Sequence, residues 1–150
     1  MIEAWFDGCT EPINPGGHAA FGVLVKVNGK IVTAYGQYVG NGPQISNNVA
    51  EYAGVASALK EVSKYEDETI IRGDSMLVIN QLGGSWKVRG GLYQPFYEAA
   101  LKLLIPIRDR VEFEWIPREE NEECDELSKR VLRDRGIRFR IQPETAGIVR

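Results

Sequence analysis

The stretch FGVLVKVNGKIVTAYGQYV, residues 21–39, contains the clearest local structural signal in the chain. Two segments rich in apolar and β-branched residues, 21–27 and 30–39, flank Asn28-Gly29, the dipeptide best suited to a two-residue type I′ turn. The stretch therefore predicts a β-hairpin. Upstream, the short apolar segment 2–6 predicts a strand that ends at Asp7-Gly8, before a glycine-rich loop. The chain thus opens with three antiparallel strands.

Downstream of the hairpin, helical and extended patterns alternate. Their limits follow from capping residues, glycines and prolines. The expected elements are a helix over 47–64 capped by Ser46, a strand over 69–72, a short helix after Gly73-Asp74-Ser75 that Gly83-Gly84 ends, a helix over about 93–104 before Pro106, a strand over 111–116, and a helix from Asn121 as cap to about Arg135, closed by Gly136.

This order of elements predicts an α/β fold. Strands joined through a helix are usually parallel, so we expect a mixed five-stranded sheet, three antiparallel strands and then two parallel ones, with helices on both faces. The sequence has no G-x-x-x-x-G-K-[ST] or G-x-G-x-x-G motif, which opposes an NTPase or a nicotinamide enzyme. A small doubly wound enzyme acting on a nucleotide is an alternative that the opening hairpin also opposes.

Composition suggests an ordinary globular protein. The 150 residues are 43% hydrophobic and 26% charged, and no stretch approaches the ~20 apolar residues of a membrane span. No signal-peptide pattern opens the sequence, so we expect a cytoplasmic protein with no membrane partner. Cys9 and Cys124 lack the spacing of a zinc site and are expected to be reduced thiols.

The charges are segregated along the chain. A net charge of -3 is unusual for a protein that binds nucleic acid. However, residues 112–126 carry eight acidic side chains and one basic one, whereas residues 129–140 carry six basic side chains and one acidic one. A basic surface is therefore compatible with the negative total.

Four acidic residues on four separate elements are candidates for one site. Asp7 and Asp74 each follow a predicted strand, where open α/β sheets place their chemistry. Glu51 shares helical spacing with an apolar stripe, and Asp125 lies in the first turn of the last helix. Convergent carboxylates repel one another unless a cation compensates, and all-oxygen ligands suit Mg²⁺ or Mn²⁺. Two such ions could activate water and stabilise a leaving oxygen of a phosphodiester.

Each acid also has a structural interpretation. Asp7 could open a turn, Asp74 could cap the helix beginning at Ser75, and Asp125 could complement a helix dipole. Glu51 could be a partly exposed glutamate at the edge of the stripe. Spacing alone leaves these alternatives open.

Five motifs in order resemble the type 1 ribonucleases H over nearly the whole chain. They are Phe6-Asp7-Gly8 with Asn14-Pro15-Gly16-Gly17; Ser46-Asn47-Asn48-Val49-Ala50-Glu51; Gly73-Asp74-Ser75; Trp115-Ile116-Pro117-Arg118; and Asn121-Glu122-Glu123-Cys124-Asp125-Glu126-Leu127. The resemblance implies a ribonuclease H-like fold and an endonuclease that hydrolyses the RNA strand of RNA/DNA hybrids, leaving 3′-hydroxyl and 5′-phosphate ends.

The resemblance also assigns roles to the acids. Asp7 would bridge two ions, Glu51 and Asp74 would hold the ion at the leaving group, and Asp125 the ion that activates water. Protein side chains that enter the wide minor groove of the hybrid would distinguish RNA from DNA by the 2′-hydroxyl of the RNA strand.

Further residues match substrate contacts of the family. The minor-groove set is Asn14, Asn47, Asn48, Glu51 and Met76, and Ser46 and Arg118 are further candidates for substrate binding. Trp86-Lys87-Val88-Arg89 is similar to a shorter form of the segment that follows the DNA strand. The structural alternatives are a polar first helical turn for Asn47 and Asn48, a core gap-filler for Met76, and a solvated loop for Lys87 and Arg89.

The chain departs from the family pattern at two places. Many relatives have a histidine in the loop before the last aspartate, but residues 117–125 contain none; Glu119, Glu120 or Glu122 could replace it, or could simply solvate the loop. The only histidine is His18. A catalytic domain over 1–136 is followed by a tail over 137–150, which we expect to pack on or beside the same domain. Residues 137–141 of this tail alternate apolar and basic side chains as an edge strand would.

Two other functions use the same fold. A catalytically weak nucleic-acid-binding module would keep the basic and asparagine contacts but would not need all four acids. Activity on double-stranded RNA is open because both duplexes present A-like shape and 2′-hydroxyls. We expect a monomer whose partner is an RNA/DNA hybrid and, as an alternative, double-stranded RNA.

Overall fold

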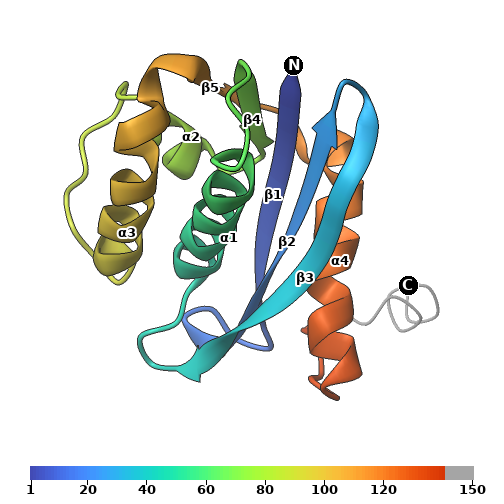
Figure 1. Ribbon diagram of the computed structural model, residues 1–150. Helices are drawn as coiled ribbons and strands as arrows, with labels where there is room; N and C mark the ends of the chain where they lie inside the picture. The colour runs from blue at the N-terminus through green and yellow to red at the C-terminus, as the bar shows by residue number, and fades with distance from the viewer. Residues whose placement is uncertain (141–150) are drawn as a thin grey trace.

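The computed structural model describes residues 1–140 and has the expected mixed sheet (Figure 1). The strand order is β3-β2-β1-β4-β5; β1 pairs antiparallel with β2, and β2 with β3, whereas β4 pairs parallel with both β1 and β5. The elements are β1 (Ile2–Glu11), β2 (Gly16–Val27), β3 (Lys30–Gly42), α1 (Asn47–Val62), β4 (Thr69–Gly73), α2 (Met76–Leu82), α3 (Gln94–Leu104), the 3₁₀ helix η1 (Ile105–Arg110), β5 (Val111–Trp115), the 3₁₀ turn η2 (Arg118–Glu120) and α4 (Glu122–Asp134).

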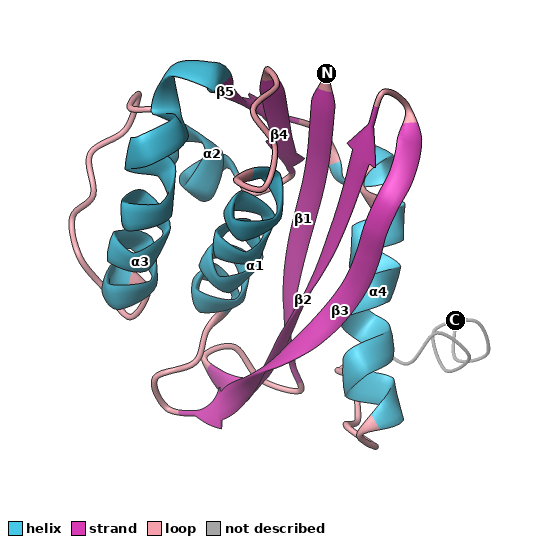
Figure 2. Ribbon diagram, viewed as in Figure 1, coloured by secondary structure: helices cyan, strands magenta, loops and turns pink. Residues whose placement is uncertain are grey.

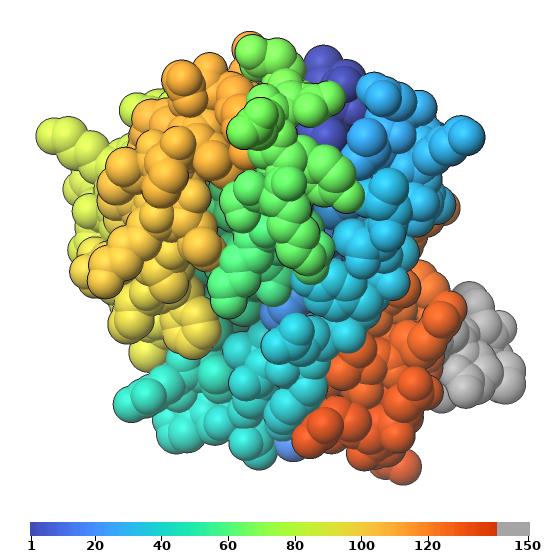
Figure 3. Space-filling model, in the orientation of Figure 1, coloured from blue at the N-terminus to red at the C-terminus, as the bar shows by residue number. Residues whose placement is uncertain are grey.

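Helices cover both faces of the sheet (Figure 2). On one face, α1, α2 and α3 share an apolar core with the strands, in which Phe6, Tyr52 and Ile71 are fully buried. On the other face α4 packs across β1, β2 and β3, and Leu132 is its fully buried anchor. Figure 3 shows the surface on the α1 and α3 side, with α4 visible at its edge beside β3. The prediction of helices on both faces of the sheet is confirmed.

The hairpin forms as the Asn-Gly dipeptide predicts. Val27 pairs with Lys30, and Asn28 and Gly29 have φ values of 51° and 82°. Positive φ at both central residues is the requirement of a type I′ turn, which asparagine and glycine meet at little cost. The turn therefore fixes the register of β2 on β3.

Three local predictions were wrong. β1 continues past Asp7 to Glu11 because its far half pairs with β2, from Asp7↔Gly22 to Glu11↔His18. The side chain of Asn121 does not cap α4; its Nδ2 donates instead to the carbonyl of Phe6 at 2.9 Å. Residues 137–140 form no strand, and the rest of the predicted edge strand lies outside the described residues.

The start of the tail packs on the domain without pairing into the sheet. Phe139 is buried against Cys9, Ala20 and Leu132. The backbone N–H and Nε of Arg140 donate to Glu11 Oε1 at 2.9 and 3.1 Å, so residues 139 and 140 are tied to the end of β1. Within residues 1–140, no helix is long and apolar enough to cross a membrane.

Candidate active site

Sheet geometry brings Asp7 and Asp74 together. The parallel pairing of β1 with β4 ends at Trp5↔Arg72, and each aspartate lies two residues beyond that pair. Because parallel neighbours leave their last pair in the same direction, the two side chains emerge at one edge. Asp74 is not the helix cap, since Ser75 Oγ accepts from the N–H of Val78 and fills that role.

A close backbone contact brings Glu51 to the same edge. A Cβ atom added at Gly8 would lie 2.6 Å from the amide nitrogen of Glu51, so only glycine lets α1 approach β1 this closely. Val55 and Leu59, which share the helical stripe with Glu51, are fully buried. Burial of the stripe therefore turns the carboxylate of Glu51 towards the strand ends.

Asp125 reaches the site from the other face of the sheet. It lies in the first turn of α4, and Gly22 of β2 lets that helix approach, because a Cβ at position 22 would collide with the carbonyl oxygen of Cys124. Asp125 accepts from Lys129 Nζ at 2.9 Å, one helical turn further along α4. A second glycine contact thus positions the fourth acid.

Three of the four carboxylates form a tight group. Among residues 1–140, one carboxylate oxygen each of Asp7, Glu51 and Asp74 lies within 4.8 Å of the others, and Asp125 is outside this group. Burial, with the charges of Asp74 and Asp125, raises the pKa of Asp7 to about 8. The N–H of Gly8 donates to Asp7 Oδ1 at 3.0 Å and opposes this rise only in part. The fold therefore holds a carboxyl group where its charge is costly.

The neighbouring acids show the same cost. Burial, with the charges of Asp7 and Asp74, raises the pKa of Glu51 well above its ordinary value. Burial also raises the pKa of Asp74, although the nearby guanidinium of Arg118 opposes the rise. Glu51 Oε1 is buried without a hydrogen-bond partner. Buried oxygen donors that lack a protein partner suit a hard divalent cation, so the residues fit an Mg²⁺ or Mn²⁺ site.

All four acids line one cleft of about 670 Å³. Asn47 and Arg118 from the predicted substrate set line it too. Sequence reasoning missed the basic and aromatic side chains that also line this cleft, although the spacing of 129 and 133 from Asp125 on one helix is a signal that could have found two of them. These are Lys129, Arg133, Phe139 and Arg140.

The predicted minor-groove residues lie at the start of α1 and nearby. Ser46 Oγ accepts from the N–H of Val49 and caps the helix, as predicted. Asn14 Oδ1 accepts from the N–H of Asn47 at 3.0 Å, which links the glycine-rich loop to the helix. Asn48 is exposed. Met76 is 50% exposed at the start of α2, so it is not a core gap-filler.

The segment between α2 and α3 is anchored by one buried glutamine. Gln81 Oε1 accepts from the hydroxyl of Tyr52 at 2.5 Å, while its Nε2 donates to the hydroxyl of Tyr93 at 3.0 Å and to the carbonyl of Lys87 at 3.3 Å. Trp86, Lys87 and Arg89 themselves are exposed. The predicted DNA-strand segment is therefore a surface loop fixed from beneath by Gln81.

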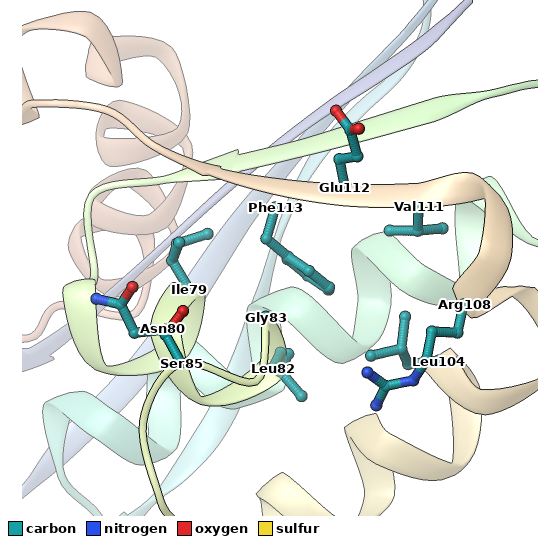
Figure 4. A pocket seen from close by; sticks show the side chains of 10 residues that line it. All are labelled: Ile79, Asn80, Leu82, Gly83, Ser85, Leu104, Arg108, Val111, Glu112 and Phe113. Atoms are coloured by element: carbon teal, nitrogen blue, oxygen red, sulfur yellow. The ribbon is translucent and has the colours of Figure 1, made fainter.

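A second cavity lies among α2, α3 and β5, and Glu112 is the one acidic residue in its lining. Its volume is about 370 Å³, and Ile79, Leu104 and Phe113 contribute to its lining. Figure 4 shows Phe113 and Glu112 pointing to opposite sides of β5, so this acid turns away from its neighbour. Nothing in this lining resembles the four-acid cleft.

The histidine and the cysteines lie outside the carboxylate group. His18 Nδ1 is 2.7 Å from the hydroxyl of Tyr38, and His18 is not among the residues lining the cleft. Cys9 and Cys124 are buried and free, as expected for reduced thiols. Burial raises the pKa of Cys9 to about 11, so its thiol is a poor nucleophile.

Comparisons with known proteins show the family to which the chain belongs. Residues 6–131 match the model of a family described as reverse transcriptase-like. Ribonuclease HI of Halobacterium salinarum is 34% identical over 138 residues, which cover 89% of this chain and 65% of that protein. The chain therefore spans slightly less than two thirds of the length of this curated relative.

Two solved structures are similar over most of the chain. The RNase H1 of the halophilic archaeon Halobacterium salinarum NRC-1 has a TM-score of 0.76 and 31% identity, covering 89% of this chain and 98% of that one. LC11-RNase H1, solved in complex with an RNA/DNA hybrid, has a TM-score of 0.76 and 28% identity, covering 87% and 95%.

Proposed function

The chain belongs to the reverse transcriptase-like family and, within it, to the type 1 ribonucleases H, and on this premise we propose that it hydrolyses the RNA strand of RNA/DNA hybrids. The single observation that carries the proposal is the group of carboxylates formed by buried Asp7 and partly buried Glu51 and Asp74, with Asp125 in the same cleft. A related protein, LC11-RNase H1, was solved with such a hybrid bound.

The four acids are the proposed ligands of two divalent cations, Mg²⁺ or Mn²⁺. Asp7 would serve both ions, Glu51 and Asp74 would complete one site, and Asp125 the other. When bound, such a pair activates a water and stabilises the departing oxygen of a phosphodiester, which would leave 3′-hydroxyl and 5′-phosphate ends. The protein's own contribution is to hold the oxygens in place before the substrate arrives, since α1 and β1 are locked together at Gly8.

The substrate would lie across the cleft and the loops beside it. Asn14, Ser46, Asn47, Asn48 and Met76 cluster around the starts of α1 and α2, and they are proposed to read the minor groove, where 2′-hydroxyls mark the RNA strand. Arg118 lies near Asp74 and would contact the sugar-phosphate backbone of the substrate there. Trp86, Lys87 and Arg89 would follow the DNA strand by stacking and charge. A monomeric state and a cytoplasmic location remain predictions.

A cleavage assay tests the function. Labelled RNA/DNA hybrid, duplex RNA and duplex DNA are incubated side by side with Mg²⁺, with Mn²⁺ and with chelator. We expect cuts in the RNA of the hybrid with either ion and none with chelator. Cleavage of duplex RNA as well would widen the substrate class, whereas binding without any cleavage would replace the proposal with the weak-binding alternative.

A further inference from the structure

Asp125 differs from the other three acids in its partner. Within residues 1–140 it stands outside the group formed by Asp7, Glu51 and Asp74. Its Oδ2 accepts from Lys129 Nζ at 2.9 Å, and both residues line the cleft. The fourth proposed ligand is therefore already bound to a cation, and that cation belongs to the protein.

An ammonium group and a metal ion cannot both lie close to the same carboxylate without repelling each other. Lys129 has three donors and no lone pair to offer a metal, so it can only compete for Asp125. Its side chain is 38% exposed and ends a flexible four-carbon stem. The ion pair joins residues four apart on α4, and exposed pairs of this kind are weak. The contact can therefore form and release without unfolding the helix.

We infer that Lys129 is a built-in competitor that occupies Asp125 in the cation-free protein and weakens divalent-ion binding at that acid. The inference rests on the proposed function in one respect, that Asp125 is a metal ligand. Binding of an ion there displaces the Lys129 ammonium towards solvent, to which its side chain is already partly exposed. The two proposed ion sites are thus unequal, because among the four acids, as the described residues place them, Asp125 is the one in an ion pair with a basic side chain.

Lys129→Met tests the competition directly, since methionine keeps a long unbranched side chain and good helix propensity. Mn²⁺ is titrated into each protein by calorimetry, and we expect Lys129→Met to bind about two- to fivefold more tightly, the range of a weak exposed ion pair. Arg130→Met is the matched control: it removes the same charge one position along α4, from an exposed residue that does not line the cleft. Thermal melts verify that both variants fold.

A double-mutant cycle separates release of Asp125 from a general charge effect. In an Asp125→Asn background, Lys129→Met should leave Mn²⁺ affinity unchanged, because the carboxylate for which Lys129 competes is gone. Equal gains for Lys129→Met and Arg130→Met, no gain for Lys129→Met, or a full gain in the Asp125→Asn background would each overturn the inference. Because calorimetry needs no substrate, a hybrid that is never cut would refute the proposed function while leaving this result to stand.

Discussion

Asp7 is held where a negative charge is costly unless a cation is near. Its pKa is raised from 3.8 to about 8, mainly by burial and next by Asp74 and Asp125. A carboxyl group whose pKa is higher in the folded than in the unfolded protein contributes stability that is fully present below the unfolded pKa. This contribution is lost as pH rises through about 8. In cation-free protein, Asp7 therefore weakens the fold progressively as pH rises from about 4 to about 8, and the loss persists at higher pH.

Asp7→Asn should remove this cost and with it the cleavage activity. We expect hybrid cleavage to fall by more than about 100-fold, beyond the cost of losing an outer partner of a metal ligand. In the presence of chelator, we expect Asp7→Asn to melt at a higher temperature than the wild type, and this difference should increase from pH 4 to pH 8. Asp134→Asn, at an exposed position at the end of α4, is the control and should show no such trend. A difference independent of pH would contradict the electrostatic explanation.

At the residue scale, sequence motifs were sufficient to select the four acids as candidates but not to identify the residues around them. Asp7, Glu51, Asp74 and Asp125 were all selected from the sequence, and all four line one cleft. The ion pair of Asp125 with Lys129 was missed because a basic residue one helical turn away is usually a solvated surface residue. Only the orientation of α4 reveals that it faces the acids.

At the scale of elements, the contact of α1 with β1 sets the position of Glu51. Gly8→Ala should force the two backbones apart, since its Cβ would overlap the main chain of Ala50 and Glu51. We expect a loss of unfolding free energy of about 1–3 kcal/mol, as for other overpacked sites, together with weaker Mn²⁺ binding by calorimetry. Gly54→Ala on the same helix is the control, because its Cβ would lie 3.2 Å from the Phe21 side chain and at an ordinary contact distance of 3.6 Å from the Asp7 carbonyl oxygen. Unchanged Mn²⁺ affinity in Gly8→Ala would show that this contact does not position the site.

The loop between α2 and α3 depends on Gln81. Gln81→Met should free the carbonyl of Lys87 and weaken hybrid binding about tenfold, equivalent to ~1.4 kcal/mol, with a smaller change in turnover. Asn80→Ala is the control, because the backbone carbonyl of Asn80 still accepts from Ser85 and Trp86. Steady-state kinetics below the melting temperature separate KM from kcat. An effect on kcat alone would argue against a binding role for this loop.

Element boundaries were less predictable than element types. The hairpin, α1 and β4 followed from turn, capping and apolar patterns that act locally. The second half of β1 did not, because residues 7–11 lack an apolar run and are extended only through pairing with β2. Asn121 illustrates the same limit: its side chain bonds to Phe6, 115 positions away, instead of capping its own helix.

At the scale of the whole molecule, the start of the tail closes the α4 side of the domain. Phe139→Ala should lower the free energy of unfolding by about 3 kcal/mol, because the ring is buried against Cys9, Ala20 and Leu132. Urea denaturation measures the change, with the exposed Arg138→Ala as control. A loss no larger than that of the control would mean that Phe139 contributes nothing to the core. The mixed antiparallel and parallel pairing and the helices on both faces were predictable from chain order, whereas this packing required the three-dimensional structure.

Acids that are far apart in the sequence lie together to hold divalent cations, and a crystal soaked in Mn²⁺ tests this arrangement most directly. An anomalous difference map should contain a peak within ~2.2 Å of carboxylate oxygens of Asp7, Glu51 and Asp74. A second peak beside Asp125 should be stronger in Lys129→Met than in the wild type. A map from fully soaked crystals with no peak among these oxygens would contradict the account.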